Sequence, residues 1–119
     1  MILLDSNLII YSTIPAQAAV RRFVRANETG ASAISYVETL GFHRITKDQK
    51  EKLERFFRSI EVLPLESDVL DEAVRLRQER KISLGDALIA GTALVHNLPL
   101  ATNNASDFRH IVGLNLIPV

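Results

Sequence analysis

Short apolar runs alternate along the chain with longer stretches in which apolar residues recur every three or four positions. The short runs favour buried β-strands and cover residues 2–4, 31–34, 62–65, 98–102 and 114–119. The longer stretches favour amphipathic helices and cover residues 8–12, 15–27, 35–45, 46–60, 68–81 and 84–97. Strands that alternate with helices predict an α/β fold, a three-layer α/β/α sandwich around a mostly parallel sheet. No linker or repeat interrupts the pattern, so we expect one domain over residues 1–119.

Polar residues and breakers mark the limits of these elements. Hydroxyl residues suited to N-capping stand before four helices: Ser35, Thr46, Ser67 and Ser83. Glu38 and Gln49 follow two of them at the spacing of a capping box. Gly30 is expected to end the second helical unit, and Pro64 places the third strand near an edge of the sheet. The helix that Ser83 opens is apolar on nearly every side, which predicts burial against the sheet.

Composition narrows the function classes. The chain has 119 residues, of which 47% are hydrophobic and 24% charged, as in ordinary globular domains. It contains no cysteine, which excludes disulfides and thiolate metal sites and fits a reducing compartment. Without a signal-peptide pattern or an apolar run of membrane-spanning length, we expect a cytoplasmic protein with no membrane partner. Fourteen basic residues balance fourteen acidic ones, so net charge neither favours nor opposes nucleic-acid binding.

Four acidic residues stand at predicted strand ends or in first helical turns: Asp5, Glu38, Asp86 and Asp107. Taken singly, each has an ordinary explanation as a helix cap, a first-turn acid or a polar loop residue. In a parallel sheet, however, the carboxyl ends of the strands share one edge, where ligands bind. Carboxylates gathered there repel one another and favour a bound cation. A donor set made only of oxygen favours Mg²⁺ or Mn²⁺ over zinc.

Other chemistries have less support. The chain contains neither GxxxxGK[ST] nor GxGxxG, and its three histidines lie far apart without a serine pattern for a triad. A phosphatase-type pair of aspartates is excluded because Asn7 occupies the second position. A receiver-like phosphoacceptor domain shares the predicted architecture, but it should cluster adjacent acids where this chain has Asp5 alone. It stays open as the less favoured alternative.

Four motifs occur in an order that resembles a known family. They are LDSN after the first apolar residues, SYVE at the start of a helix, LGDALIAGTA, and LATNNASDF followed by GLNLIPV. This order closely resembles the PIN-domain family, and within it the VapC-type toxins of toxin–antitoxin pairs. The resemblance implies an α/β/α endoribonuclease that depends on Mg²⁺ or Mn²⁺ and usually forms a homodimer. It also implies a VapB-like antitoxin, which often inserts a basic residue into the acidic pocket.

The same resemblance implies roles for individual residues. Asp5, Glu38 and Asp86 match the metal-binding and catalytic acids of the family. Many relatives place a fourth acid in a TxDxDF-like loop, where this chain offers only Asp107; Asn104 is the alternative at that position. The groups expected to hold the carboxylates in place are Ser6, Asn7, Thr102 and Asn104.

Two surfaces are candidates for larger partners. Candidate RNA-binding residues are Arg21, Arg22 and Arg25 on one helix and, at the start of a second basic stripe, Arg44. Either stripe has a solvated helix face as its ordinary explanation. Phe42, Phe56 and Phe57 lie where an antitoxin groove is expected, although we favour a core position for at least two of them. A PIN-like protein that binds metal or RNA without cleaving it remains the main alternative function.

Overall fold

The computed structural model describes residues 1–119 and contains a five-stranded sheet. The strand order is β3-β2-β1-β4-β5, and every neighbouring pair is parallel. The strands are β1 (Ile2–Leu4), β2 (Thr29–Ser32), β3 (Glu61–Leu63), β4 (Leu100–Thr102) and β5 (Leu116–Pro118). The helices are α1 (Ser6–Ser12), α2 (Ala18–Ala26), α3 (Ala33–Leu40), α4 (Lys47–Arg58), α5 (Ser67–Glu79), α6 (Leu84–Val95) and the 3₁₀ turn η1 (Ala105–Asp107).

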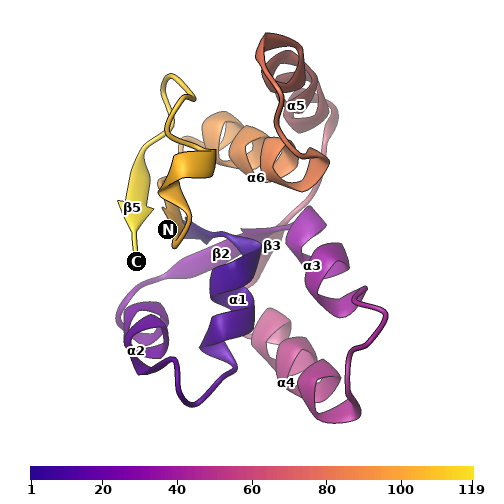
Figure 1. Ribbon diagram of the computed structural model, residues 1–119, viewed down its shortest axis with the longest axis vertical. Coiled ribbons are helices and arrows are strands. Elements are labelled where there is room, and N and C mark those ends of the chain that lie inside the picture. The colour runs from indigo at the N-terminus through magenta and orange to yellow at the C-terminus, as the bar shows by residue number, and fades with distance from the viewer.

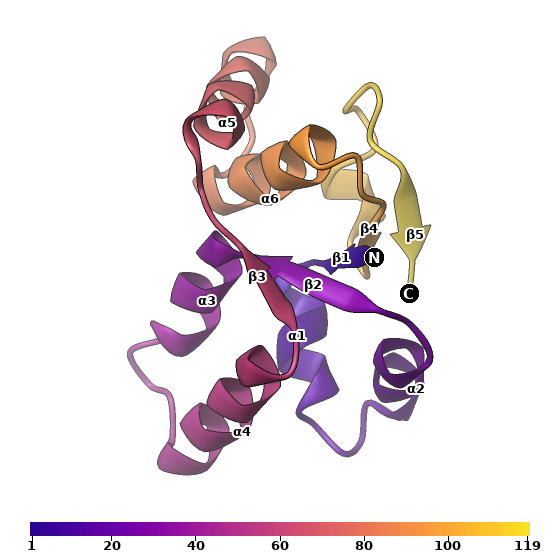
Figure 2. The ribbon, with the colours of Figure 1, turned by 180° about the vertical axis from the view of Figure 1, so that it is seen from behind.

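Two apolar cores, one on each face of the sheet, join the layers. Leu3 and Leu100 belong to a core that includes side chains of α5 and α6, whereas Leu4 and Ala101 belong to one that includes side chains of α1, α2 and α4. Adjacent strand residues face opposite layers because side chains alternate along a strand. Figures 1 and 2 show α5 and α6 on one side of the sheet and α1, α2 and α4 on the other. The predicted α/β/α sandwich is confirmed.

Helix α6 is the most deeply buried helix, as its composition predicts. Every residue from Ala87 to Ala93 is buried. A Cβ atom added at Gly91 would lie 3.1 Å from the Val69 carbonyl oxygen and 3.3 Å from the Ala73 nitrogen, so the small residue lets α5 pass close to α6. None of the helices combines the length and the apolar character that a membrane crossing requires.

The second strand differs from the prediction. It covers Thr29–Ser32 instead of residues 31–34, and α3 therefore begins at Ala33 rather than at residue 35. Gly30 lies in the strand instead of ending a helix, and its lack of a side chain leaves room for Met1, since a Cβ there would lie 2.7 Å from Met1 Sδ. Small residues of low strand propensity are accepted here because the strand is buried between β1 and β3.

The helix limits show which capping predictions hold. Thr46 and Gln49 form the predicted capping box, with Gln49 N–H donating to Thr46 Oγ1 at 3.1 Å, and Ser83 caps α6 as expected. The Ser35–Glu38 box is wrong, because Ser32 Oγ accepts the Ile34 N–H at 3.3 Å and is the actual cap of α3.

Four further limits differ from the prediction. Ser67 is the first residue of α5 rather than its cap, and residue 15 precedes α2, which begins at Ala18. Helix α3 ends before Gly41, so residues 42–45 form a turn, and α6 ends before Asn97, whose φ of 52° is left-handed. Strand β3 lies at an edge, as Pro64 predicts, but it covers Glu61–Leu63 instead of residues 62–65 and so ends before the proline.

Candidate active site

Asp5 and Thr102 lie side by side at the carboxyl edge of the sheet, because β1 and β4 are neighbouring parallel strands. The Asp5 side chain is only 6% exposed. Thr102 Oγ1 donates to Asp5 Oδ2 at 2.8 Å and accepts the Asn104 N–H at 2.9 Å. One hydroxyl therefore orients the carboxylate and also fixes the start of the loop that follows β4.

Burial makes the charge on Asp5 unfavourable. Desolvation raises its pKa above 3.8, and repulsion from Asp107 raises it further. The hydrogen bonds from Thr102 and from the Ser6 backbone N–H oppose this rise without cancelling it. The carboxylate is thus held by one donor on β4 and one at the first residue of α1, and its side chain does not form the N-cap hydrogen bond of that helix.

Glu38 reaches the same edge from α3. Ser6 Oγ, on the first turn of α1, donates to Glu38 Oε1 at 2.9 Å and lies 2.9 Å from the buried Ser35 Oγ. The other carboxylate oxygen lies over α6, since a Cβ atom added at Gly85 would be 2.1 Å from Glu38 Oε2. Gly85 thus provides the space in which the Glu38 carboxylate lies next to Asp86.

Asp86 connects the four acids electrostatically. It lies half-buried in the first turn of α6, where its N–H donates to Ser83 Oγ at 3.2 Å. Desolvation raises its pKa to about 6, with a second contribution from the negative charge of Asp5 and smaller ones from Asp107 and Glu38. All four predicted acids therefore face one region of the molecule.

Asp107 and Asn104, the two candidates for the fourth position, form a single unit. Asn104 Nδ2 donates to Asp107 Oδ2 at 2.5 Å, and Ser106 Oγ donates to Asn104 Oδ1 at 3.2 Å. The negative charge of Asp107 raises the pKa of both Asp5 and Asp86. The carboxylate belongs to the acidic group, and the amide orients it.

The four carboxylates have no basic partner. The ion pairs of the structure join Lys52 to Asp48, and Arg75 to Glu72 and Glu79, all outside this group. No three acidic or histidine side chains lie close enough to hold one metal ion directly. Mg²⁺ characteristically keeps several of its waters and takes one or two carboxylates. The donor set therefore fits a hard divalent ion held partly through water.

Some predicted residues lie elsewhere. Asn7 is exposed, and its side chain forms no hydrogen bond with the rest of the protein. Arg21 and Arg25 line a hollow with Thr29 at the amino end of β2, the edge opposite the acids. Arg22 and Arg44 are exposed on α2 and in the turn before α4. The structure does not bring Arg21 and Arg25 to the acidic group, and an RNA contact by these arginines stays a prediction.

Sequence reasoning missed three basic residues that are close to the acids. Arg80, Lys81 and His110 line one hollow together with Asp86 and Asp107. The available signal was the position of Arg80 and Lys81 just before the Ser83 cap of α6. His110 gave no signal, because only the fold places the segment after η1 opposite the start of α6.

The arrangement matches a known family over almost its whole length. The family model described as "PIN domain" matches residues 2–114. The chain belongs to the PIN domain family. It is also 34% identical over 116 residues to Ribonuclease VapC10 of Mycobacterium tuberculosis. That alignment covers 91% of this chain and 86% of the relative. This PIN chain is therefore similar to VapC proteins, as its motifs indicate, and the receiver-like alternative is set aside.

Solved structures agree with this assignment. VapBC2 from Rickettsia felis, bound to a DNA fragment from its promoter, superposes with a TM-score of 0.86 at 25% identity and covers 99% of this chain and 98% of that one. A toxin–antitoxin complex from Klebsiella pneumoniae superposes with a TM-score of 0.82 at 26% identity, covering 98% and 96%. The PIN fold and the VapC-like architecture of this chain are thus established.

Proposed function

We propose that this PIN chain is an endoribonuclease that depends on Mg²⁺ or Mn²⁺ and acts as the toxin of a VapBC-type pair. The observation that carries the proposal is the convergence of Asp5, Glu38 and Asp107 on Asp86 with no cationic side chain at ion-pair distance from any of the four. The similarity to a protein named as a VapC ribonuclease supports RNA as the substrate.

The residues of the site would have different roles in phosphodiester hydrolysis. Asp5, Glu38 and Asp86 would hold the divalent ion, directly or through water. When bound, the ion supplies a Lewis acid that activates water and neutralises charge developing on the phosphate. Ser6 fixes Glu38 and Thr102 fixes Asp5, so both carboxylates are oriented before substrate arrives.

Asp107 is suited to handle a proton. Its Oδ2 accepts the Asn104 amide, so Oδ1 is free to accept a proton from the attacking water. In-line attack by that water would break the bond to the 3′ oxygen, leaving a 5′-phosphate and a 3′-hydroxyl. The Asp86 carboxyl, with a pKa of about 6, is largely ionised at neutral pH and becomes fully so beside a cation.

A hollow between α1 and α4 supports an antitoxin as partner. It is lined by apolar side chains of Ile10, Ile14, Phe42, Ile45 and Leu53. Phe42 is 52% exposed there, whereas Phe57 is buried and Phe56 packs against the same core, as favoured for two of the three. We infer that a segment of a VapB-like antitoxin covers this hollow.

A second copy of the chain is the other proposed partner. Exposed apolar side chains occur on α3 and α5, at Tyr36, Val37, Leu70 and Val74. Contiguous exposed apolar patches mark association sites, and we propose that these four side chains form part of the contact between two copies of the chain. A molar mass of twice 13.3 kDa by light scattering is expected for the homodimer. A monomer at all concentrations would contradict it.

The decisive experiment is cleavage of RNA by the purified chain. We expect 5′-labelled RNA to be cut in Mg²⁺ or Mn²⁺, the activity to disappear with EDTA, and the new ends to carry 5′-phosphate. Asp5→Asn should be inactive while it keeps the circular dichroism spectrum of the parent. RNA binding without cleavage under any of these conditions would instead favour the non-cleaving alternative. The absence of three acids at direct-ligand spacing is the observation that keeps this second candidate in view.

A further inference from the structure

Two of the four acids, Asp86 and Asp107, line a hollow of about 410 Å³ that is also lined by basic residues. One wall is the segment between α5 and α6, which contributes Arg80, Lys81 and Asp86. The other wall is η1 and the residues after it, which contribute Asp107 and His110. Carboxylates and cations thus share the mouth of the proposed site instead of occupying separate faces.

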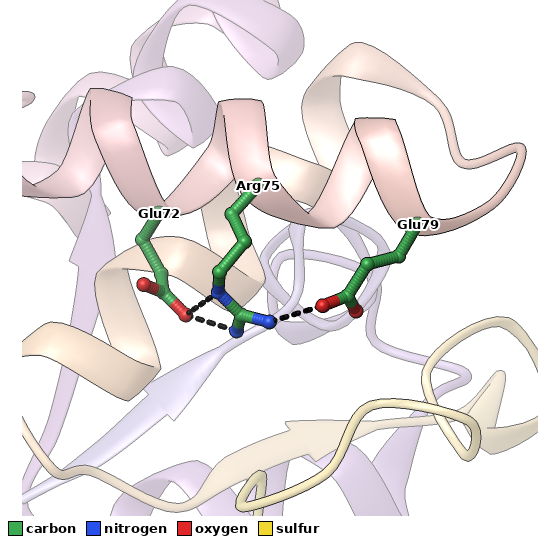
Figure 3. A network of polar contacts seen from close by, with 3 residues as sticks. All are labelled: Glu72, Arg75 and Glu79. Atoms are coloured by element: carbon green, nitrogen blue, oxygen red, sulfur yellow. Dashed lines mark hydrogen bonds and ion pairs between the residues drawn. The ribbon is translucent and has the colours of Figure 1, made fainter.

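Arg80 and Lys81 are free to bind a ligand. Both are exposed, and neither forms an ion pair, although Asp86 and Asp107 line the same hollow. Arg75, five residues earlier, differs in this respect. Figure 3 shows its guanidinium between Glu72 and Glu79, to both of which it donates. The charge of Arg75 is therefore neutralised within α5, whereas Arg80 and Lys81, in the segment after that helix, have no acidic side chain at ion-pair distance.

We propose that Arg80 and Lys81 bind phosphates of the RNA strand next to the bond that is cleaved, with His110 contacting the same stretch from the opposite wall. This inference rests on the proposed function, since it assigns residues to the substrate of that site. RNA phosphates are repelled by the four carboxylates, so a strand can enter the site only where cations offset that repulsion. Arg80 and Lys81 supply two positive charges at that point.

The two residues act as positioning groups rather than catalytic ones. The planar guanidinium of Arg80 can donate two parallel hydrogen bonds to a phosphate, whereas Lys81 offers a compact point charge. Their removal should weaken RNA binding and leave the chemical step largely unchanged. This distinguishes them from Asp5 or Asp86, whose loss removes activity itself.

The test compares an Arg80→Ala/Lys81→Ala double variant with Arg77→Ala. Arg77 is exposed on α5, three residues before Arg80, forms no ion pair and does not line the hollow, so it is a matched control. Binding of a fluorescent single-stranded RNA is measured in the Asp5→Asn background in Mg²⁺ at a series of salt concentrations. Because each phosphate contact on a single strand contributes roughly 0.7 to the slope of log affinity against log salt, we expect the double variant to lose about 1.4 units of slope.

Steady-state cleavage by the otherwise unaltered chain provides the second readout. We expect KM for RNA to rise about tenfold in the double variant and kcat to stay within about twofold, since two charge-assisted contacts are lost from the bound strand. His110→Gln should raise KM by a smaller factor. Arg80→Lys/Lys81→Arg should restore most of the slope, and Arg77→Ala should match the parent in both measurements.

The outcomes separate this inference from the proposed function. An unchanged salt slope in the double variant, an equal loss in Arg77→Ala, or no RNA binding by the parent at low salt would overturn the inference. RNA binding that depends on Arg80 and Lys81, combined with no cleavage in Mg²⁺ or Mn²⁺, would overturn the proposed function and leave the inference standing.

Discussion

The Glu38 carboxylate lies directly over Gly85, so close that a Cβ atom at residue 85 would be 2.1 Å from Glu38 Oε2. The Gly85→Ala variant should therefore displace Glu38 from its place beside Asp86. We expect activity to fall about 100-fold, because misplacement of a catalytic group by roughly an ångström has that effect. The free energy of unfolding should stay the same or rise by up to ~1 kcal/mol, since alanine favours a helix more than glycine does. Urea unfolding and cleavage rates test the two effects separately.

A double variant shows whether Gly85 acts through Glu38. If it does, Gly85→Ala combined with Glu38→Gln should be no less active than Glu38→Gln alone, because both changes remove the same interaction. Losses that multiply would mean that alanine disturbs the start of α6 by another route. Full activity of the single Gly85→Ala variant would show that Glu38 has no role at its observed position.

Asp5→Asn should remove cleavage activity and raise the stability of the folded protein. The asparagine Oδ1 can still accept the Thr102 hydroxyl, so the hydrogen bond is retained while the buried negative charge is lost. The Asp5 pKa is raised in the folded protein, which means that its charge opposes folding at neutral pH. We expect a higher Tm in EDTA and no detectable cleavage, because the carboxylate that would hold the ion is lost. Cleavage at the parental rate would remove Asp5 from the site.

The pH dependence of stability should show the raised pKa of Asp86. Its pKa is raised from 3.8 to about 6 on folding, so the folded chain binds the proton more tightly than the unfolded chain. The stability that this proton contributes is fully present below pH 3.8 and is lost as pH rises through about 6. Asp86→Asn, which is uncharged throughout, should match the parent near pH 4 and exceed it in free energy of unfolding above pH 7. Urea titrations in EDTA measure that difference. Parallel curves for the two proteins would show that the folded pKa of Asp86 is ordinary.

Thr102 should prove to be the residue that couples the loop to Asp5. Thr102→Val keeps the shape of the side chain but removes the donor to Asp5 Oδ2 and the acceptor for the Asn104 N–H. Unpaired buried polar groups cost about 1–3 kcal/mol, so the free energy of unfolding should fall by that amount. Activity should fall about 10–100-fold, because Asp5 loses its orientation. Thr102→Ser is the control, because serine keeps the hydroxyl, and it should retain both the stability and the activity of the parent. Equal behaviour of the valine and serine variants would show that the methyl group, and not the hydroxyl, matters here.

The edge that carries the site could be predicted from the sequence because it depends only on the parallel direction of the strands. Asp5 follows β1 and Thr102 ends β4, and the apolar pattern shows both strands. Two parallel neighbours must present these residues together. The apolar pattern and the absence of a cysteine therefore predicted a site of oxygen donors at this edge before any contact was known.

The contacts that complete the site depend on how helices pack, which periodicity does not specify. The spacing of Ser35 and Glu38 is that of a capping box, but tertiary packing prevents one. Ser35 is buried in the interior, and Glu38 accepts a hydrogen bond from Ser6. The approach of Glu38 to Gly85 requires the relative positions of α3 and α6. The limits of β2 were mispredicted for a related reason. Its small residues have low strand propensity, but burial between two strands overrides that propensity.

Divalent ions should stabilise the folded chain in a way that depends on pH. An ion that binds only the folded state adds about 2.7 kcal/mol at a concentration of 100 times Kd, which raises the Tm of a domain of this size by roughly 10 °C. We expect a rise of this kind with Mn²⁺ or Mg²⁺ at pH 7.5 and a much smaller one near pH 4.5, where the Asp86 carboxyl, with its pKa of about 6, is mostly protonated. Asp86→Asn should lose most of the effect at pH 7.5, whereas Asp48→Asn, which alters an exposed acid paired with Lys52 on α4, should keep it. Differential scanning fluorimetry over a metal titration measures all four cases. Equal shifts in the two variants would show that the ion binds the surface in general, because only a site built on Asp86 distinguishes one acid from the other.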